Sequence, residues 1–428
     1  MHALRRWPFT RDTTQTVGIL VLVLASVVSW RRGVLYSGGT DPVVVAKAAV
    51  AVLALLCAAV RWRSAPVRRP LTPFPTLLVI AIVGIALVGA VQAGTLTANL
   101  VLTVRIALLA TTLVLVMATT TTEAAFTAVL AAMAAIGLVA AGTGAVAMLL
   151  HLGGAHHGRL AGGIPPLAPN ELATLVLPPA IGLLSVVVRR GLRPAPTAAL
   201  VVLAGIILAS GSRVALAMLG VAALIIVLRE RRLTTGVAVV ALLSLLAGYV
   251  VVMFSSALTQ LTLRGQGTGQ LLTLNSRTIS WQAVLGTSPT TWGWWIGNGL
   301  SMKSIGVVGQ YWTTQVFDSS WISSIAQDGV LGTVLLAVYV LVTLVAVIRR
   351  RSLGSAVLAV TVTIAIRSFF ENGLIESSAT FALFFVIALG SWPGTDRPAR
   401  AAGPGGGSAA DRVLRVPEWE ALVPDAAG

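Results

Sequence analysis

The chain has 428 residues, of which 56% are hydrophobic and 10% are charged. Ordinary soluble domains carry about a quarter charged residues, so this composition excludes a water-soluble globular fold. A net charge of +16 would suggest nucleic-acid binding in a soluble protein. In a chain this apolar, the placement of Lys and Arg beside hydrophobic segments is the more informative signal, and we predict no nucleic-acid partner.

Hydrophobic segments recur along nearly the whole sequence. A bilayer core of about 30 Å needs about 20 apolar residues per helix, and most segments approach that length. We therefore predict an all-α fold, a polytopic transmembrane helical bundle of about 12 spans surrounded by membrane lipids. The spans are expected at residues 13–30, 43–60, 74–91, 98–118, 124–150, 169–188, 195–209, 214–228, 234–254, 320–348, 355–370 and 378–389.

The alternation of apolar and polar stretches divides the chain into four parts. Residues 1–254 hold the first nine predicted helices, and residues 318–392 hold the last three. Between them, residues 255–317 are rich in Gly, Ser, Thr and Trp and are predicted to form a large extracytoplasmic loop with interfacial helices. The tail, residues 393–428, is rich in Gly, Pro and Ala and is predicted to be disordered in the cytoplasm.

Basic residues orient the predicted bundle. With the N-terminus inside, most Arg residues fall on inner segments, in groups at 5–11, 61–69, 189–193, 229–232, 349–351 and 397–415. Because basic flanks mark the cytoplasmic side, both termini are predicted to be cytoplasmic. The preference for Arg over Lys and the abundance of Ala, Val and Gly indicate a GC-rich bacterial gene, so we expect a bacterial cytoplasmic (inner) membrane.

An Arg interrupts the apolar pattern near the middle of the chain. The turn from Ser210 to Arg213 separates two apolar segments and places Arg213 at the predicted outer surface. A guanidinium close to hydrocarbon is costly and usually faces a protein cavity with a partner, which predicts an anion-binding residue. The alternative is an Arg whose head group reaches back to the lipid headgroups.

The predicted outer loop contains a second Arg followed by many Trp residues. Arg277 opens a predicted interfacial helix that runs through Trp281. Trp residues at this depth often form only an interfacial belt. The alternative is that some rings stack on sugar faces or on a prenyl chain.

An acidic residue stands where this loop re-enters the membrane. Asp318 and Ser319 are followed by nine residues, then Gly329, two further residues, and Gly332 with Thr333. Asp318 is one of few acidic residues on the predicted outer side, and a simple alternative role is to cap the next helix.

These stretches together resemble the bacterial O-antigen ligase and polymerase superfamily. The spacing after Asp318 is similar to the ligase pattern His-[Asn/Ser/Gln]-x9-Gly-x-x-Gly-Thr, with Asp in place of the His. Other similar stretches are Gly158-Arg159 followed by Pro169-Asn170, the turn from Ser210 to Arg213, and Arg277 with Trp281 ahead of Gly297-Asn298-Gly299. The late outer loop fits the same family.

The resemblance implies transfer of a glycan from an undecaprenyl-diphosphate carrier to an acceptor hydroxyl on a glycan, lipid or protein, without a metal or other cofactor. The leaving diphosphate needs positive charge, and the fork of a guanidinium supplies it in place of a metal ion. Arg213 and Arg277 are predicted as catalytic residues, and Arg159, Arg105, Asn170 and Trp281 as substrate-binding residues.

A single displacement at the anomeric carbon needs a base and inverts the configuration. Asp318 is the predicted catalytic base, with Glu171, Glu371 and Glu376 as rivals. Arg367 and Glu371 also have the spacing of a simple i, i+4 ion pair.

Other functional classes remain open from sequence. A transporter or flippase of lipid-linked saccharides is the main alternative, but no repeated half and few intramembrane acids are apparent. A glycosyltransferase that uses a monophosphate carrier usually shows an acidic pair in its first outer loop, where Asp41 stands alone. A structural membrane scaffold would leave the outer Arg residues without a role.

Overall fold

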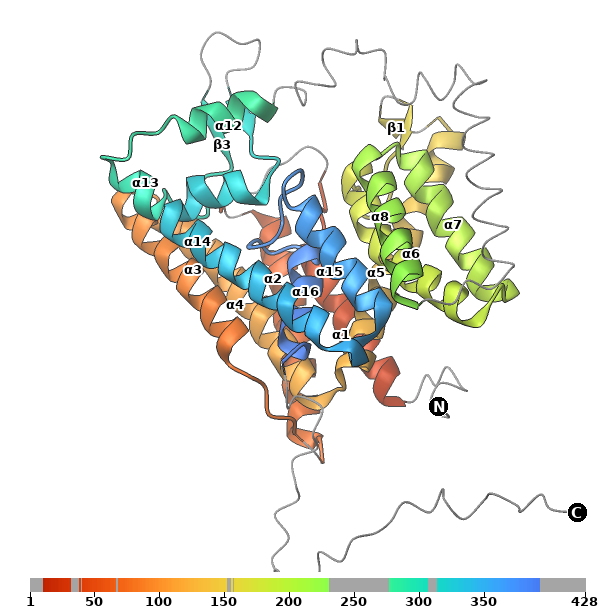
Figure 1. The fold of residues 1–428 in the computed structure, drawn as a ribbon. Helices are drawn as coiled ribbons and strands as arrows, with labels where there is room; N and C mark the ends of the chain where they lie inside the picture. The colour runs from red at the N-terminus through yellow and green to blue at the C-terminus, as the bar shows by residue number, and fades with distance from the viewer. Residues whose placement is uncertain are drawn as a thin grey trace, which may run out of the picture.

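The computed structural model describes residues 11–31, 38–39, 41–66, 68–151, 155–156, 158–230, 277–306 and 314–392. This part of the chain is mostly helical (Figure 1). Before residue 231 the helices are α1 (Arg11–Val27), α2 (Pro42–Ser64), α3 (Phe74–Gln92), α4 (Leu96–Thr119), α5 (Thr122–Leu149), α6 (Pro169–Arg190), α7 (Pro194–Ser210) and α8 (Arg213–Glu230). After residue 276 they are α12 (Arg277–Leu285), α13 (Trp292–Ile296), α14 (Ser320–Arg349), the short 3-10 helix η1 (Arg351–Leu353), α15 (Gly354–Arg367) and α16 (Ala379–Gly390).

Two short antiparallel hairpins complete the described part. β1 (Ala155–His156) pairs with β2 (Arg159–Leu160), and β3 (Ser304–Gly306) pairs with β4 (Thr314–Val316). β3, β4, α12 and α13 belong to the predicted outer loop, of which residues 255–276 and 307–313 lie outside the described residues.

Six of the described helices, α2 to α6 and α14, are long and apolar enough to cross a membrane. Shorter apolar helices lie at Thr13–Val27, Pro194–Ser210 and Ala379–Gly390. The prediction of a helical membrane bundle is confirmed at this level. Every predicted span in the described part coincides with a helix, whereas the span predicted at 234–254 lies outside it. The total of about 12 spans therefore stays a prediction.

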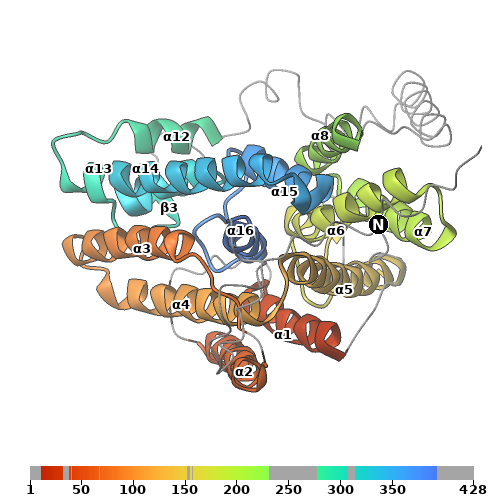
Figure 2. The same cartoon turned by 60° about the horizontal axis from the view of Figure 1, so that its bottom comes forward.

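The centre of the bundle is the short helix α16. Figure 2 shows α16 nearly end-on, surrounded by the other helices, and its residues from Phe381 to Gly390 are all buried. Tyr339 of α14 packs edge-on against Phe384, with 5.1 Å between the ring centroids. Around this centre α14 lies along α3, α5 packs between α1 and α6, and α6 contacts α7, α8 and α15.

The described helix ends meet in two groups. At one end Arg189, near the end of α6, donates to Glu230 of α8 at 2.7 Å and to Ser355 of α15 at 3.2 Å. The opposite end, where α6, α8, α14 and α16 begin, is called the Asn170 end below. Charge placement predicts that the Asn170 end faces outward.

Helix α14 is broken at Gly329, whose φ of 68° is left-handed. The backbone N–H groups of Asn298 and Gly299 donate to the carbonyl groups of Ala326 and Gln327, just before the break, at 3.0 and 2.8 Å. A Cβ on Gly297 or Gly329 would overlap the backbone of the facing segment. The Gly297-Asn298-Gly299 motif and the motif that begins at Gly329 therefore meet in one backbone junction. This junction fixes the first half of α14 against α13.

Candidate functional site

The first two turns of α6 gather polar contacts from several parts of the chain. Pro169 occupies the first turn, where its missing N–H removes no helical bond. Glu171 closes this turn, because its Oε2 accepts from the backbone N–H of Ala168 at 2.9 Å. Its Oε1 accepts from Ser29 Oγ at 3.0 Å, so the Glu171 carboxylate, a predicted rival base, is occupied on both oxygens.

Asn170 and Arg159 bind each other beside the α7–α8 turn. Arg159 Nη2 donates to Asn170 Oδ1 at 2.7 Å, and Arg159 Nε donates to the carbonyl of Ser210 at 2.6 Å. Gly211 caps α7 with a left-handed φ of 61°, and a Cβ there would lie 3.2 Å from Arg159 Nε. Three stretches that the sequence singled out thus meet at one place.

Arg213 is the first residue of α8, two positions beyond Gly211. Its Nε and Nη2 atoms are buried and have no hydrogen-bond partner. A helix N-terminus carries partial positive charge, so a guanidinium there is unfavourable unless an anion is near. An Arg that reaches the headgroups would keep its donors hydrated. This arrangement favours an anion-binding role over the snorkelling alternative.

Arg105 lies within α4 and is half-buried. It is within electrostatic range of Lys47 in α2, and Lys47 also interacts with Glu171. The Arg105 cation therefore belongs to the Asn170 end.

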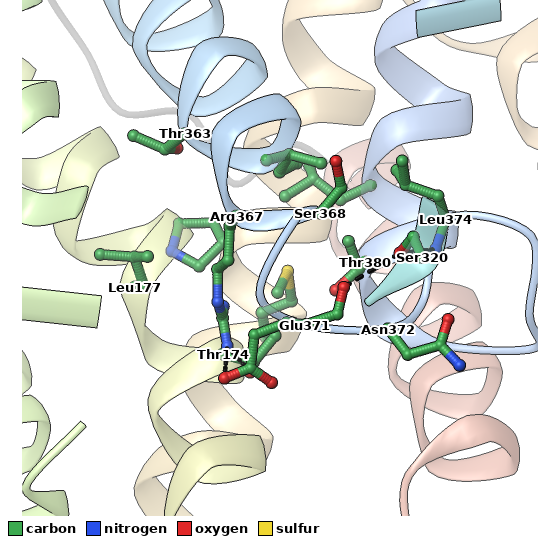
Figure 3. Close-up of a pocket in the computed structure, with 14 residues that line it drawn as sticks. Thr174, Leu177, Ser320, Thr363, Arg367, Ser368, Glu371, Asn372, Leu374 and Thr380 are labelled. Atoms are coloured by element: carbon green, nitrogen blue, oxygen red, sulfur yellow. Dashed lines mark hydrogen bonds and ion pairs between the residues drawn. The ribbon is translucent and has the colours of Figure 1, made fainter. Parts of the chain in front are cut away.

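The polar contacts continue from Asn170 to α15. Thr174 Oγ1 donates to the carbonyl of Asn170 at 2.7 Å and accepts a hydrogen bond from Arg367 Nη2. Arg367 also pairs with Glu371, with 3.8 Å between Nη2 and Oε1, so the predicted i, i+4 pair is present. Figure 3 shows Arg367, Glu371 and Thr174 in the wall of a pocket bounded by α6, α14, α15 and α16.

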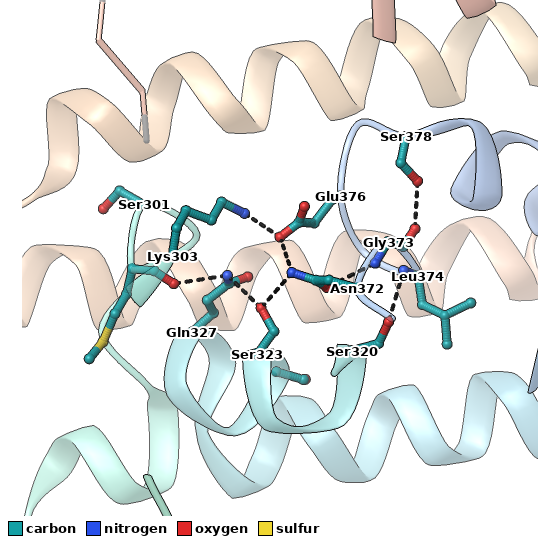
Figure 4. Close-up of polar contacts among 12 residues, drawn as sticks. Ser301, Lys303, Ser320, Ser323, Gln327, Asn372, Gly373, Leu374, Glu376 and Ser378 are labelled. Carbon is teal, nitrogen blue, oxygen red and sulfur yellow. Dashed lines mark hydrogen bonds and ion pairs between the residues drawn. The ribbon is translucent and has the colours of Figure 1, made fainter. Parts of the chain in front are cut away.

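A second polar network lies beside this pocket (Figure 4). Lys303 pairs with Glu376, which accepts from Asn372 Nδ2 at 2.7 Å. Asn372 also donates to Ser323 Oγ at 3.1 Å, and Gln327 donates to the same oxygen at 2.8 Å. The network ties the β3 region to the first half of α14 and to the turn between α15 and α16. Sequence reasoning missed it, because the paired residues are far apart in the chain.

The Glu376 carboxylate is charged at neutral pH. Burial acts to raise its pKa, but the charge of Lys303 and the hydrogen bonds from Lys303 and Asn372 outweigh that effect, so the pKa lies below the ordinary value of 4.5. This carboxylate therefore contributes stability that is complete above the unfolded pKa and is lost as pH falls through the lower folded pKa.

We expect Glu376→Gln to lower the thermal unfolding midpoint in detergent at pH 7. The difference from the unsubstituted protein should persist down to about pH 5. It should shrink below about pH 4, because the carboxyl is then protonated in the unfolded chain and becomes protonated in the folded protein as the pH falls further. The measurement is a series of melting curves at different pH values. A difference that is constant down to pH 3 would contradict the ion pair.

Three predicted site residues lie apart from α6. Trp281 on α12 packs against a small cluster of Val284, Phe317, Ile322 and Ala326, and its Nε1 is buried without a partner. Asp318 lies one residue before Ser319, the N-cap residue of α14. Arg277 begins α12, but its side chain lies outside what the structure describes.

Within the described residues, no group of three or more His, Cys, Asp or Glu side chains is placed to hold a metal ion. A scan of the sequence against protein-family models finds no matching family, and no curated protein matches the chain.

Proposed function

We propose that the protein transfers a glycan from an undecaprenyl-diphosphate carrier to an acceptor hydroxyl at the outer face of a bacterial cytoplasmic membrane, in the manner of O-antigen ligases and polymerases. The observation that carries the proposal is Arg213, which begins α8 with two buried and unpartnered nitrogens beside the Arg159–Asn170 pair. A phosphate group would satisfy both donors and the positive helix end. The order of motifs from Arg159 to Thr333 supports the family resemblance.

In this proposal the Arg residues do the work of a metal ion. Arg213 and Arg277 bind the diphosphate and stabilise the negative charge that grows on it as the glycan leaves. Each preorganised charge of this kind lowers a barrier by about 3 kcal/mol in a site that excludes water. Arg159, Asn170 and Arg105 hold the phosphates and first sugar, and Trp281 contacts the sugar or prenyl chain. The bond to the acceptor forms on the opposite face, so the configuration inverts.

The remaining requirement is a group that takes the proton of the acceptor hydroxyl. Asp318 is the residue that the family pattern proposes for this step, in the position of the ligase His. The membrane topology completes the proposal: about 12 spans, both termini in the cytoplasm and the late loop outside.

The test uses purified protein in detergent, undecaprenyl-diphosphate-linked glycan from the bacterial host, candidate acceptors and excess EDTA. We expect release of free undecaprenyl diphosphate that depends on the acceptor and is unaffected by the chelator. Activity that disappears in EDTA and returns with Mg²⁺ or Mn²⁺ would refute the metal-independent mechanism.

The same preparation also tests the transport alternative. If no acceptor causes release, while reconstituted vesicles move the lipid-linked glycan between leaflets, the protein is a flippase.

A further inference from the structure

The pocket beside α6 contains a charged pair that the proposed diphosphate clamp does not use. Arg367 is only 6% exposed, and its Nε is buried without a hydrogen-bond partner. The Glu371 side chain remains 23% exposed, so it can be reached from outside the protein. Arg367 Nη2 lies 3.8 Å from Glu371 Oε1, and a carboxylate has more acceptor sites than this one pair occupies, so Glu371 can also accept from a ligand.

The charge and size of this pocket indicate what it binds. Arg367 and Glu371 together are neutral, so the pocket offers no net attraction for a phosphate. It presents one unsatisfied donor and one carboxylate acceptor, which suit a hydroxyl group that accepts from one and donates to the other. The enclosed space takes about one water molecule or one hydroxyl, so a sugar hydroxyl would enter while its ring stays at the mouth.

Two other carboxylates at this end already have hydrogen-bond or ion-pair partners. Glu171 caps α6 and accepts from Ser29, and Glu376 is bound by Lys303 and Asn372. Asp318 lies before α14 and does not line this pocket. Glu371 lines it and comes from the turn after α15. It is linked through Arg367 to Thr174, and Thr174 is in turn linked to Asn170.

We propose that Glu371 is the residue that receives the acceptor proton, and that Arg367 positions the reacting hydroxyl. The inference rests on the proposed glycan transfer. The hydroxyl oxygen bonds to the anomeric carbon while the bond from that carbon to the diphosphate oxygen breaks. The electron pair leaves with the diphosphate, and the hydroxyl proton passes to the Glu371 carboxylate. Arg367 Nε donates to the hydroxyl oxygen and orients its lone pair.

The decisive comparison is between a hydroxyl acceptor and azide. Azide is already an anion and needs no base, so it attacks the anomeric carbon without losing a proton. We expect Glu371→Gln to lower kcat/KM for the hydroxyl acceptor by at least about 100-fold, as for loss of a general base. The same variant should form glycosyl azide at a rate close to that of the unsubstituted protein. Arg367→Lys should raise KM for the hydroxyl acceptor about tenfold, as for loss of a hydrogen bond from a charged donor.

Matched controls separate a chemical effect from a structural one. Glu230→Gln removes the carboxylate of the Arg189–Glu230 pair at the opposite end and should leave both reactions unchanged. Asp318→Asn tests the rival base in transfer to the hydroxyl acceptor. If Asp318→Asn abolishes that transfer and Glu371→Gln does not, Asp318 is the base and the inference is wrong.

The remaining outcomes are also distinct. A Glu371→Gln variant that melts normally but loses both reactions would show that Glu371 acts in binding or positioning, which overturns its role as base. If the unsubstituted protein forms neither product, the proposed transfer itself fails and the inference fails with it.

Discussion

Arg213→Ala is expected to lower kcat/KM for glycan transfer by at least about 100-fold without lowering the stability of the fold. The loss follows from the diphosphate charge that this guanidinium would balance. The stability should stay the same or rise, because the side chain has two buried nitrogens without partners and stands at a positive helix end. A residue kept for packing alone would show the opposite result. The measurements are the release of undecaprenyl diphosphate and the melting midpoint in detergent.

Two further variants control this prediction. Arg213→Lys should recover little activity, since an ammonium cannot form the two-pronged contact with phosphate oxygens. Arg349→Ala removes an exposed Arg from the end of α14 and should leave activity and stability unchanged. Full activity in Arg213→Ala would remove Arg213 from the proposed clamp.

Gly329→Ala is expected to lower the free energy of unfolding by at least about 2 kcal/mol. The residue has a left-handed φ, and an added Cβ would overlap the backbone of Trp295 and Ile296. Relief of that overlap would separate α13 from α14 and break the bonds from Asn298 and Gly299. The check is the melting midpoint of the purified variant together with its yield from membranes.

The matched control is Gly220→Ala within α8. An added Cβ there would meet nothing within 4 Å, and the backbone is helical. This variant should be unchanged or stabilised by up to about 1 kcal/mol, because Ala favours helix over Gly. Equal losses in both variants would contradict a special role for the junction at Gly329.

The helices of the described part follow from local sequence. Long runs of apolar residues predict helix in a bilayer because the backbone must satisfy its own hydrogen bonds there. The ends were also readable: Pro169 opens α6, and the turn at Gly211 closes α7. The sequence showed Gly329 only as part of a glycine motif and did not predict the break in α14. The break is caused by a contact with residues about thirty positions earlier.

The candidate site was predictable in part, for a related reason. Arg213 was predicted because a guanidinium beside apolar runs needs a partner, whereas Arg159 and Asn170 were predicted from the family resemblance. Which partners they find depends on tertiary packing, as does the pairing of Lys303 with Glu376 and of Thr174 with Arg367. Trp281 shows the reverse case. Its aromatic ring suited sugar stacking, but the ring packs in a small apolar cluster formed by α12, Phe317 and the first half of α14.

The shortness of α15 and α16 affects how a substrate would approach. With 14 and 12 residues, these helices rise about 21 and 18 Å, less than the roughly 30 Å of a hydrocarbon core. If their opposite ends lie at the inner surface, the turn that carries Glu371 is recessed about 10 Å below the outer one. An acceptor would then descend through a passage walled by neighbouring helices, while a carrier lipid would enter sideways from the leaflet. The acceptor and the carrier would thus approach the Glu371 turn by separate routes, without competing for a common entrance.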